Sequence, residues 1–264
     1  MARTEPGRHM SRYVHGVKAV GVVAHVAVAS IGTSSAAPNA AAAGAGFRLD
    51  VATRGDFVAQ TNLVQCVGAS MQMMLNMIKP SDDRTAAMQL KLQNIARSYS
   101  PPRPDGRTRK GASVVGWSEG LNRLGAGPYG LVGTTTIEEA LKAAAIAIRD
   151  TGKPVGLLMW QGRHAWVMSG FQATADPWSG DFTVTAVTVQ DPLYPRVSPR
   201  WGRGPKPGQT MTVAQLGKQF LPRRSGPSAN VWLSGFGGMY VMVVPERVFS
   251  FHRPGDRPGL SKAI

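Results

Sequence analysis

The sequence contains a single cysteine, Cys66, in a chain of 264 residues. One thiol cannot form a disulfide within the chain, so no such cross-link holds this fold together. In an exported protein an unpaired thiol is exposed to oxidation, and its presence there calls for a functional explanation.

Acidic residues are also scarce: 15 Asp and Glu stand against 30 Lys and Arg, which gives a formal net charge of +15. Such an excess attracts polyanions, whether nucleic acid, anionic lipid or acidic cell-envelope polymers. The basic residues are densest at 103–110, 196–206 and 223–224, in Pro- and Gly-rich stretches typical of loops. The sequence has no nucleic-acid motif and no basic helix with interleaved aromatics. We therefore expect basic loops that can bind anionic envelope polymers, and no specific nucleic-acid site.

Long apolar runs are missing as well, and the longest candidate lies near the N-terminus. Residues 1–46 start with several basic side chains, continue with an apolar run over 19–29 and end in Ala-rich sequence. This order is typical of a secretory signal with a cleavage zone, here near Ala36 or Ala37. The run is too short to span a membrane comfortably. We expect a secreted, periplasmic or cell-envelope protein without a transmembrane domain in its mature chain. A disordered or membrane-tethering N-terminus is the alternative.

The rest of the chain has globular composition, with 43% hydrophobic and 17% charged residues, which is ample for a hydrophobic core. We expect one domain over residues 47–250 and a polar tail over 251–264. Apolar residues at helical spacing predict helices over 66–78, 85–97, 114–124 and 137–151. Apolar and alternating runs predict strands over 154–160, 164–171, 182–190 and 238–244. Helices followed by an antiparallel sheet indicate an α+β domain.

Cys66 opens the first of these predicted helices and follows a polar segment. The positive end of the helix dipole and the unpaired N–H groups at a helix N-terminus favour the thiolate, which is the nucleophilic form. The alternative is that Cys66 is a small buried hydrophobic residue on the helix.

His164 is the one histidine of five that lies inside the predicted core. It opens a predicted strand, and from the end of a sheet its ring can point towards a helix N-terminus. A Cys–His pair requires this arrangement, because thiol and imidazole must come within hydrogen-bond reach. The alternative is a histidine at a strand end with a backbone partner.

A third residue must orient the imidazole, and Asp191 is placed for this at the end of the predicted strand 182–190, directly before a proline. Asp176 also precedes a proline, but it lies in the turn between two strands, and we favour Asp191. A turn-forming role is the alternative for Asp191. Gln60 lies upstream of Cys66, and its amide could donate to an oxyanion together with the Cys66 N–H; Gln65 is a weaker candidate.

Taken together, these segments resemble the papain-like cysteine peptidases. The resemblance rests on the Gln60–Ser70 segment around Cys66, on the run from His164 to Gly170, and on Val189-Gln190-Asp191-Pro192. It is nearest to the bacterial branch that includes the bacteriocin-leader (double-glycine) peptidases and the related type III effector proteases. The segment from Arg196 to Ser234 has no counterpart in that pattern.

The resemblance implies a papain-like fold, in which an N-terminal helical half with the cysteine at a helix N-terminus packs on a C-terminal antiparallel sheet. It also implies roles: Cys66 as nucleophile, His164 as acid and base, Asp191 as orienting residue and Gln60 as oxyanion donor. The expected activity is hydrolysis of peptide or protein substrates without a metal or organic cofactor.

Two other functions stay open. An acyl transferase of the transpeptidase or transglutaminase kind would use the same thioester with an amine acceptor in place of water. A non-enzymatic envelope-binding protein would use the basic loops and make the Cys, His and Asp arrangement a coincidence.

Overall fold

The computed structural model describes residues 46–79, 81–103, 106–225 and 235–247. The expected secretory signal and the polar tail over 251–264 therefore lie outside the described residues, apart from Gly46. Among the described residues, every helix is too short or too polar to pass through a lipid bilayer.

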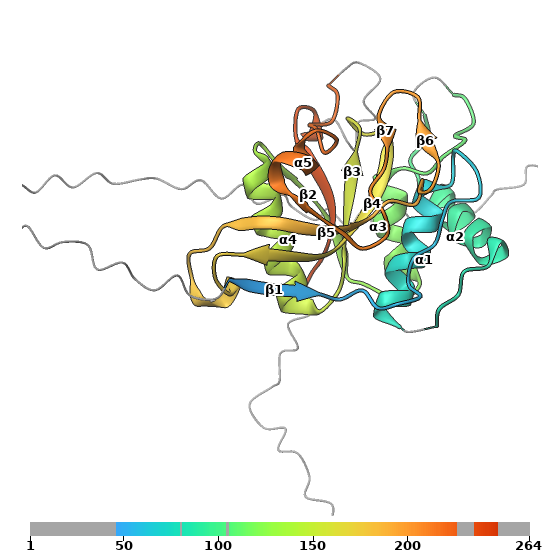
Figure 1. Cartoon of the computed structure of the whole chain (residues 1–264). Helices are drawn as coiled ribbons and strands as arrows, with labels where there is room; N and C mark the ends of the chain where they lie inside the picture. Colours follow the sequence, from blue (N-terminus) through green and yellow to red (C-terminus); the bar gives the residue numbers. More distant parts are fainter. Residues whose placement is uncertain (1–45, 80, 104–105, 226–234, 248–264) are drawn as a thin grey trace, which may run out of the picture. The chain divides into compact units, whose positions relative to one another are not determined.

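A seven-stranded antiparallel sheet forms the centre of the domain (Figure 1). Its main path runs β2–β9–β3–β4–β5–β8, and β1 pairs with β4 off this path. The first half of β4 pairs with β3 and the second half with β1, while β5 pairs with the strand over most of its length. The strands are β1 Phe47–Asp50, β2 Tyr129–Thr134, β3 Val155–Met159, β4 His164–Ala173, β5 Val184–Gln190, β8 Gln209–Thr212 and β9 Tyr240–Pro245.

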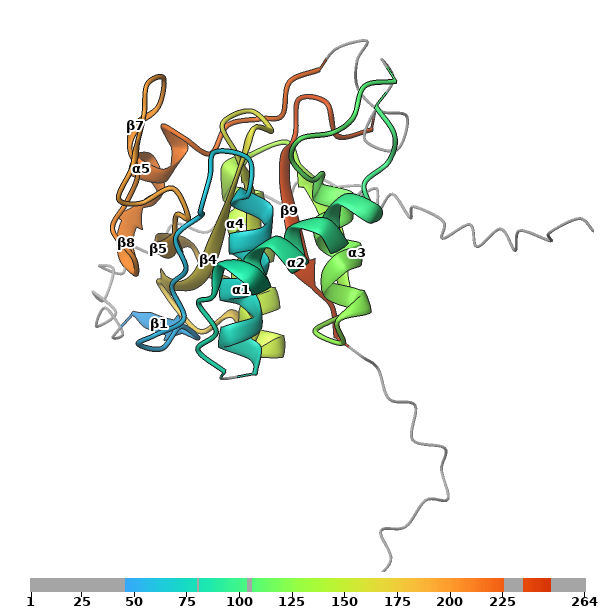
Figure 2. The same ribbon diagram turned by 90° about the vertical axis from the view of Figure 1, so that its right-hand side faces the viewer.

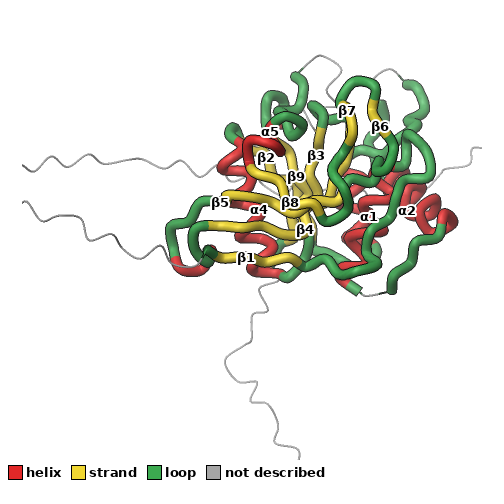
Figure 3. Tube along the Cα trace, in the orientation of Figure 1, coloured by secondary structure: helices red, strands yellow, loops and turns green. Residues whose placement is uncertain are grey.

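Helices cover both faces of this sheet (Figures 2 and 3). One face carries α1 Cys66–Ile78, α2 Ala86–Ser98 and α3 Val114–Arg123. The other face carries α4 Ile137–Thr151 and the short α5 Val213–Gly217. The connection between β5 and β8 forms a small separate hairpin, in which β6 Val197–Ser198 pairs with β7 Gly202–Arg203.

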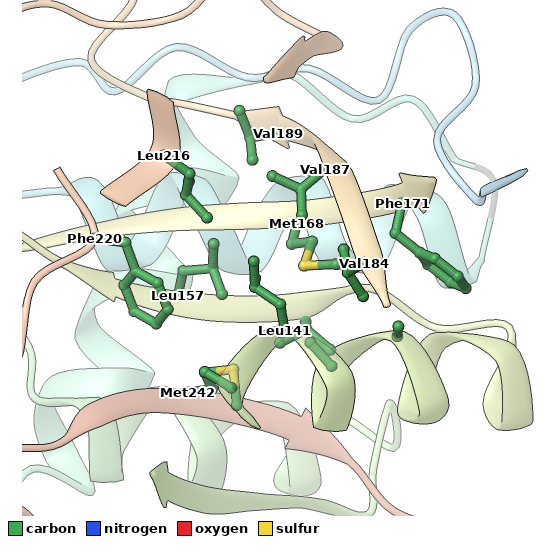
Figure 4. Packing of buried hydrophobic residues seen from close by; sticks show 14 of the residues in the cluster. Leu141, Leu157, Met168, Phe171, Val184, Val187, Val189, Leu216, Phe220 and Met242 are labelled. Carbon is green, nitrogen blue, oxygen red and sulfur yellow. The ribbon is translucent and has the colours of Figure 1, made fainter. Parts of the chain in front are cut away.

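The side chains of β4 alternate between two cores, as the pleat of a strand requires. Trp166 and Met168 pack with α4 in one buried cluster, and Ala165 and Val167 pack with α1, α2 and α3 in the other. Figure 4 shows Leu141 of α4 against the strands of the first cluster. Burying each large side chain contributes about 1.5–3 kcal/mol, so α1 is held firmly on one face of β4 and α4 on the other.

The predicted helices and the α+β class are confirmed, with most helices in the first half of the chain and most strands in the second. Thr136 and Glu139 form a capping box at the start of α4, and Gly152 ends that helix with a φ of 64°. Two strands of the first half, β1 and β2, were not predicted. β1 has only four residues, and the two glycines in β2 weaken its alternating pattern.

Candidate active site

Cys66 is the first residue of α1, and its side chain is only partly buried. The buried side chain of Gln93 on α2 accepts from the N–H of Gly68 at 2.9 Å and donates to the carbonyl of Val64 at 3.0 Å. In the part of the chain that the structure describes, the N–H groups of Cys66 and Val67 have no acceptor. The thiol therefore sits beside free amide donors at the positive end of a helix.

A second buried glutamine of α2, Gln89, holds the segment that leads to Cys66. Its Oε1 accepts from the N–H of Thr61 at 2.8 Å, and its Nε2 donates to the carbonyl of Ala59 at 3.0 Å. These bonds fix the backbone on both sides of Gln60. Gln89 and Gln93 were not predicted as site residues, because polar residues at helical spacing also fit a solvated helix face.

His164 is the first residue of β4, and the structure brings it together with Asp191. The Nε2–H of His164 donates to Oδ1 of Asp191 at 2.7 Å. The two side chains are 4% and 0% exposed. Asp191 directly follows β5, which pairs with β4, so the two residues meet at one end of the sheet.

The environment of the imidazole favours its protonated form. Burial of the ring acts against a charge, but the hydrogen bond to Asp191 and the influence of the neighbouring Cys66 outweigh burial and raise the pKa of His164 to about 9. Because Nε2 is bound to Asp191, Nδ1 is the ring nitrogen left for the thiol. The imidazole thus lies between a carboxylate and a thiol.

Asp191 is enclosed on its other side by backbone. Its Oδ1 also accepts from the N–H of Leu193 at 2.8 Å, whereas Oδ2 is buried without a hydrogen-bond partner among the described residues. A side chain at Gly204 would collide with Oδ2. The charge of this carboxylate is therefore balanced almost entirely by the imidazole.

Gln60 is buried next to the Asp191 segment, since its N–H donates to the carbonyl of Pro192 at 2.7 Å. Its Nε2 donates to the carbonyl of Asn62 at 2.8 Å, and its Oε1 has no partner in the described part of the chain. One amide hydrogen therefore stays available. The weaker candidate, Gln65, is the N-cap residue of α1, is also buried and bonds to Thr61.

Two tryptophans cover His164 from the side of the β6–β7 hairpin. Trp160 stacks on the imidazole with a centroid separation of 4.0 Å and an interplanar angle of 20°. Trp201, in the hairpin turn, lies parallel to Trp160 at 5.9 Å. Gln219 fixes Trp160 by accepting from its indole N–H at 2.9 Å. The sequence offers no signal for this stack, because Trp201 comes from the connection after β5, whereas Trp160 and His164 lie at the turn between β3 and β4.

The segment after β5, for which the sequence pattern gave no place, is tied to the site by Arg196. Its guanidinium donates to the carbonyl of Gln60 at 3.2 Å and to that of Thr61 at 3.0 Å. The β6–β7 hairpin consequently lies beside the loop that enters α1 (Figure 1).

The alternative orienting residue, Asp176, lies elsewhere. It follows β4 at the opposite end of this strand from His164, and it receives two hydrogen bonds from Arg149 of α4, at 2.9 and 2.8 Å. The four remaining histidines lie outside the described residues.

The site has to be judged by its own geometry, because the chain matches no protein-family model, no curated protein and no solved structure.

Proposed function

We propose that this protein is a cysteine hydrolase that cleaves peptide bonds with Cys66, His164 and Asp191. The observation that carries the proposal is the buried imidazole of His164, which bonds to Asp191 through Nε2 and interacts with the only thiol of the chain. A surface ion pair needs no such burial. A nucleophile and its acid–base partner do need a third group that fixes the ring.

The reaction follows from the protonation state of the pair. With a pKa of about 9, His164 carries a proton at neutral pH. The sulfur of Cys66 bonds to the substrate carbonyl carbon, and the carbonyl electrons move to its oxygen. His164 then protonates the leaving nitrogen, the C–N bond breaks and a thioester remains. Water, deprotonated by His164, attacks the thioester, and the acid and the thiolate are released.

Donors for the negative oxygen are available at the start of α1. The N–H of Cys66 is free among the described residues, and the Nε2 of Gln60 keeps one hydrogen after its bond to Asn62. Such preorganised donors stabilise the oxyanion because they need no reorientation during the reaction. We also propose that residues 1–46 direct export of the protein. This part of the proposal is independent of the geometry of the site.

The alkylation of Cys66 by iodoacetamide as a function of pH tests this proposal. Because Cys66 is the only thiol, its rate can be followed by mass without ambiguity. We expect rapid reaction at pH 6, well below the usual thiol pKa of about 8.5, and loss of this rapid phase in His164→Ala. Slow alkylation with an ordinary thiol profile in both proteins would overturn the proposal.

A substrate experiment complements the thiol chemistry. Cleavage of a mixed peptide library by the full chain should disappear in Cys66→Ala, while the circular dichroism and urea midpoint of that variant stay close to the parent values. Cleavage that persists in Cys66→Ala would mean that another group, or a contaminant, performs the reaction.

A further inference from the structure

The connections at the two ends of β4 differ in their content of charged residues, and the acids at one end have basic partners: Asp176 pairs with Arg149 and Asp181 with Lys142. Three connections meet at the His164 end: residues 160–163, 191–208 and 218–225. Trp160 and Arg224 form hydrogen bonds between the first and the third, and Trp201 of the second stacks on Trp160 of the first. Their only carboxylate is that of Asp191, whereas their basic side chains are Arg163, Arg196, Arg200, Arg203, Lys206, Lys218, Arg223 and Arg224. The turn at the opposite end, residues 174–183, contains Asp176 and Asp181 and no basic residue.

Contacts place several of these arginines around the catalytic pair. Arg163 directly precedes His164. Arg196 bonds to the backbone that leads to Cys66. Arg224 donates to the side chain of Gln161 at 2.9 Å, in the turn between β3 and β4. Arg200 lies over the ring of Trp201, which belongs to the stack on His164.

Four of the arginines at this end have no carboxylate partner in the described part of the chain. Arg163, Arg196, Arg200 and Arg224 are exposed, and none of them forms an ion pair with a carboxylate among the described residues. Arg149 and Arg247, which do pair with carboxylates, lie away from the site. A cluster of unpaired cations around a site concentrates anionic ligands and raises their rate of encounter.

The exposed apolar residues near the site favour a peptide over a nucleic acid. Leu63 and Val64, three and two residues before Cys66, are 78% and 40% exposed, and Val197 of the hairpin is 52% exposed. These are aliphatic side chains. Single-stranded nucleic acid binds on exposed aromatic faces, whereas the faces of Trp160 are covered by His164 and Trp201.

We infer that the site takes acidic peptides, in which carboxylates flank the bond that Cys66 attacks. This inference rests on the proposed function and adds the substrate class to it. The aliphatic residues before Cys66 would contact the side chains next to that bond, and the arginines of the three connections would bind the flanking carboxylates.

The charge of the alkylating agent separates this inference from the proposed function. Iodoacetate is anionic and iodoacetamide is neutral, so the ratio of their rates at Cys66, relative to that ratio for glutathione, reports the local electrostatic field. We expect this relative ratio to be roughly tenfold at low salt, the lower end of electrostatic steering effects, and to approach one in 0.5 M NaCl.

Matched variants isolate the arginines from the charge of His164. The double change Arg163→Gln and Arg200→Gln should lower the relative ratio several-fold. The double change Arg48→Gln and Arg54→Gln removes the same charge but should leave it unaltered. Arg48 pairs with Gln172, eight residues along β4 from His164, which is about 26 Å and beyond the Debye length of about 10 Å at 0.1 M salt. Arg54 precedes Gly55, which lies against Asp82 in the connection after α1, at the other end of this helix from Cys66.

Two results would overturn the inference. The first is a relative ratio near one that does not respond to salt or to the double change Arg163→Gln and Arg200→Gln. The second is protection of Cys66 by an oligothymidylate that equals or exceeds protection by an oligoglutamate peptide of similar net charge. Slow alkylation by both reagents would count against the proposed function instead. Protection by the oligoglutamate peptide alone, lost at high salt, is the expected outcome.

Discussion

The domain contains two Asp-Pro pairs that end up at opposite ends of β4, and their carboxylates have different surroundings. Asp191 bonds to His164 at 2.7 Å, and Asp176 bonds to Arg149 at 2.8 Å. Distance therefore does not distinguish them. Burial does: the first pair is 4% and 0% exposed, and the second is 26% and 30% exposed.

This difference indicates what each pair does. An ion pair that water reaches is screened and contributes little to stability. A buried pair loses hydration, and Asp191 even keeps an oxygen without a hydrogen-bond partner among the described residues. A protein keeps such a costly arrangement where it needs a group with a shifted pKa, which is the condition of an acid–base catalyst.

The largest effect is expected from Asp191→Asn. The amide keeps the shape but removes the charge that balances the imidazolium, so the pKa of His164 should fall. We expect rapid alkylation of Cys66 at pH 6 to be lost, peptide cleavage to fall by roughly 10³-fold or more, and the urea midpoint to drop. Titration of the His164 ring by NMR checks the cause directly.

Asp176→Asn is the matched control, because it makes the same chemical change at the exposed end. It should leave alkylation, cleavage and the His164 titration unaltered. If the two variants behave alike, burial is not what sets Asp191 apart, and the assignment of Asp191 as the orienting residue is wrong.

The stability contributions of the two ion pairs at the ends of β4 should also be lost at opposite extremes of pH. The pKa of His164 is raised from 6.5 to about 9 in the folded protein. Its contribution to stability is therefore complete below pH 6.5 and is lost as the pH rises through 9. Hydrogen bonds from Arg149 lower the pKa of Asp176, so its contribution is complete above the usual carboxyl pKa and is lost in acid.

Urea midpoints between pH 3 and pH 10 measure this separation. The parent protein should lose stability between pH 6.5 and 9, and Asp191→Asn should flatten that part of the curve while leaving the acid limb in place. An unchanged alkaline limb in Asp191→Asn would show that another group titrates there.

The sequence was sufficient to predict those parts of the site that depend on local position. Cys66 at a helix start and His164 at a strand start were found from hydrophobic periodicity. Asp191 was preferred to Asp176 because it ends a strand, and the strand pairing of β4 and β5 brings it to His164.

The remaining parts depend on contacts between distant segments. Gln89 reaches the backbone of Ala59, and Trp160 reaches Trp201 and Gln219, across connections whose paths no local pattern specifies. β1 and β2 were missed for a similar reason, since these strands gain their stability from pairing with β4 and β9.

A smaller effect is expected from Gln93→Ala, which removes the two hydrogen bonds that hold the backbone on either side of Cys66. This change leaves the Gly68 N–H and the Val64 carbonyl without their partner, at a cost of about 1–3 kcal/mol in the free energy of unfolding. Alkylation of Cys66 should slow several-fold, and Gln93→Glu should recover part of the rate because it keeps the acceptor for Gly68. Asn94→Ala, at the exposed neighbour, is the control and should change neither quantity.

The smallest effect is expected from Arg149→Gln at the opposite end. The guanidinium bonds to Asp176 and lies over the ring of Trp178 at 3.6 Å, but water reaches both partners. We expect a slight drop in the urea midpoint that shrinks further in 0.5 M NaCl, because salt screens exposed charges. Cys66 alkylation should keep its parent pH profile. A change in that profile would mean that the two ends of β4 are coupled through the strand, and burial alone would then not account for the role that we propose for the His164–Asp191 pair.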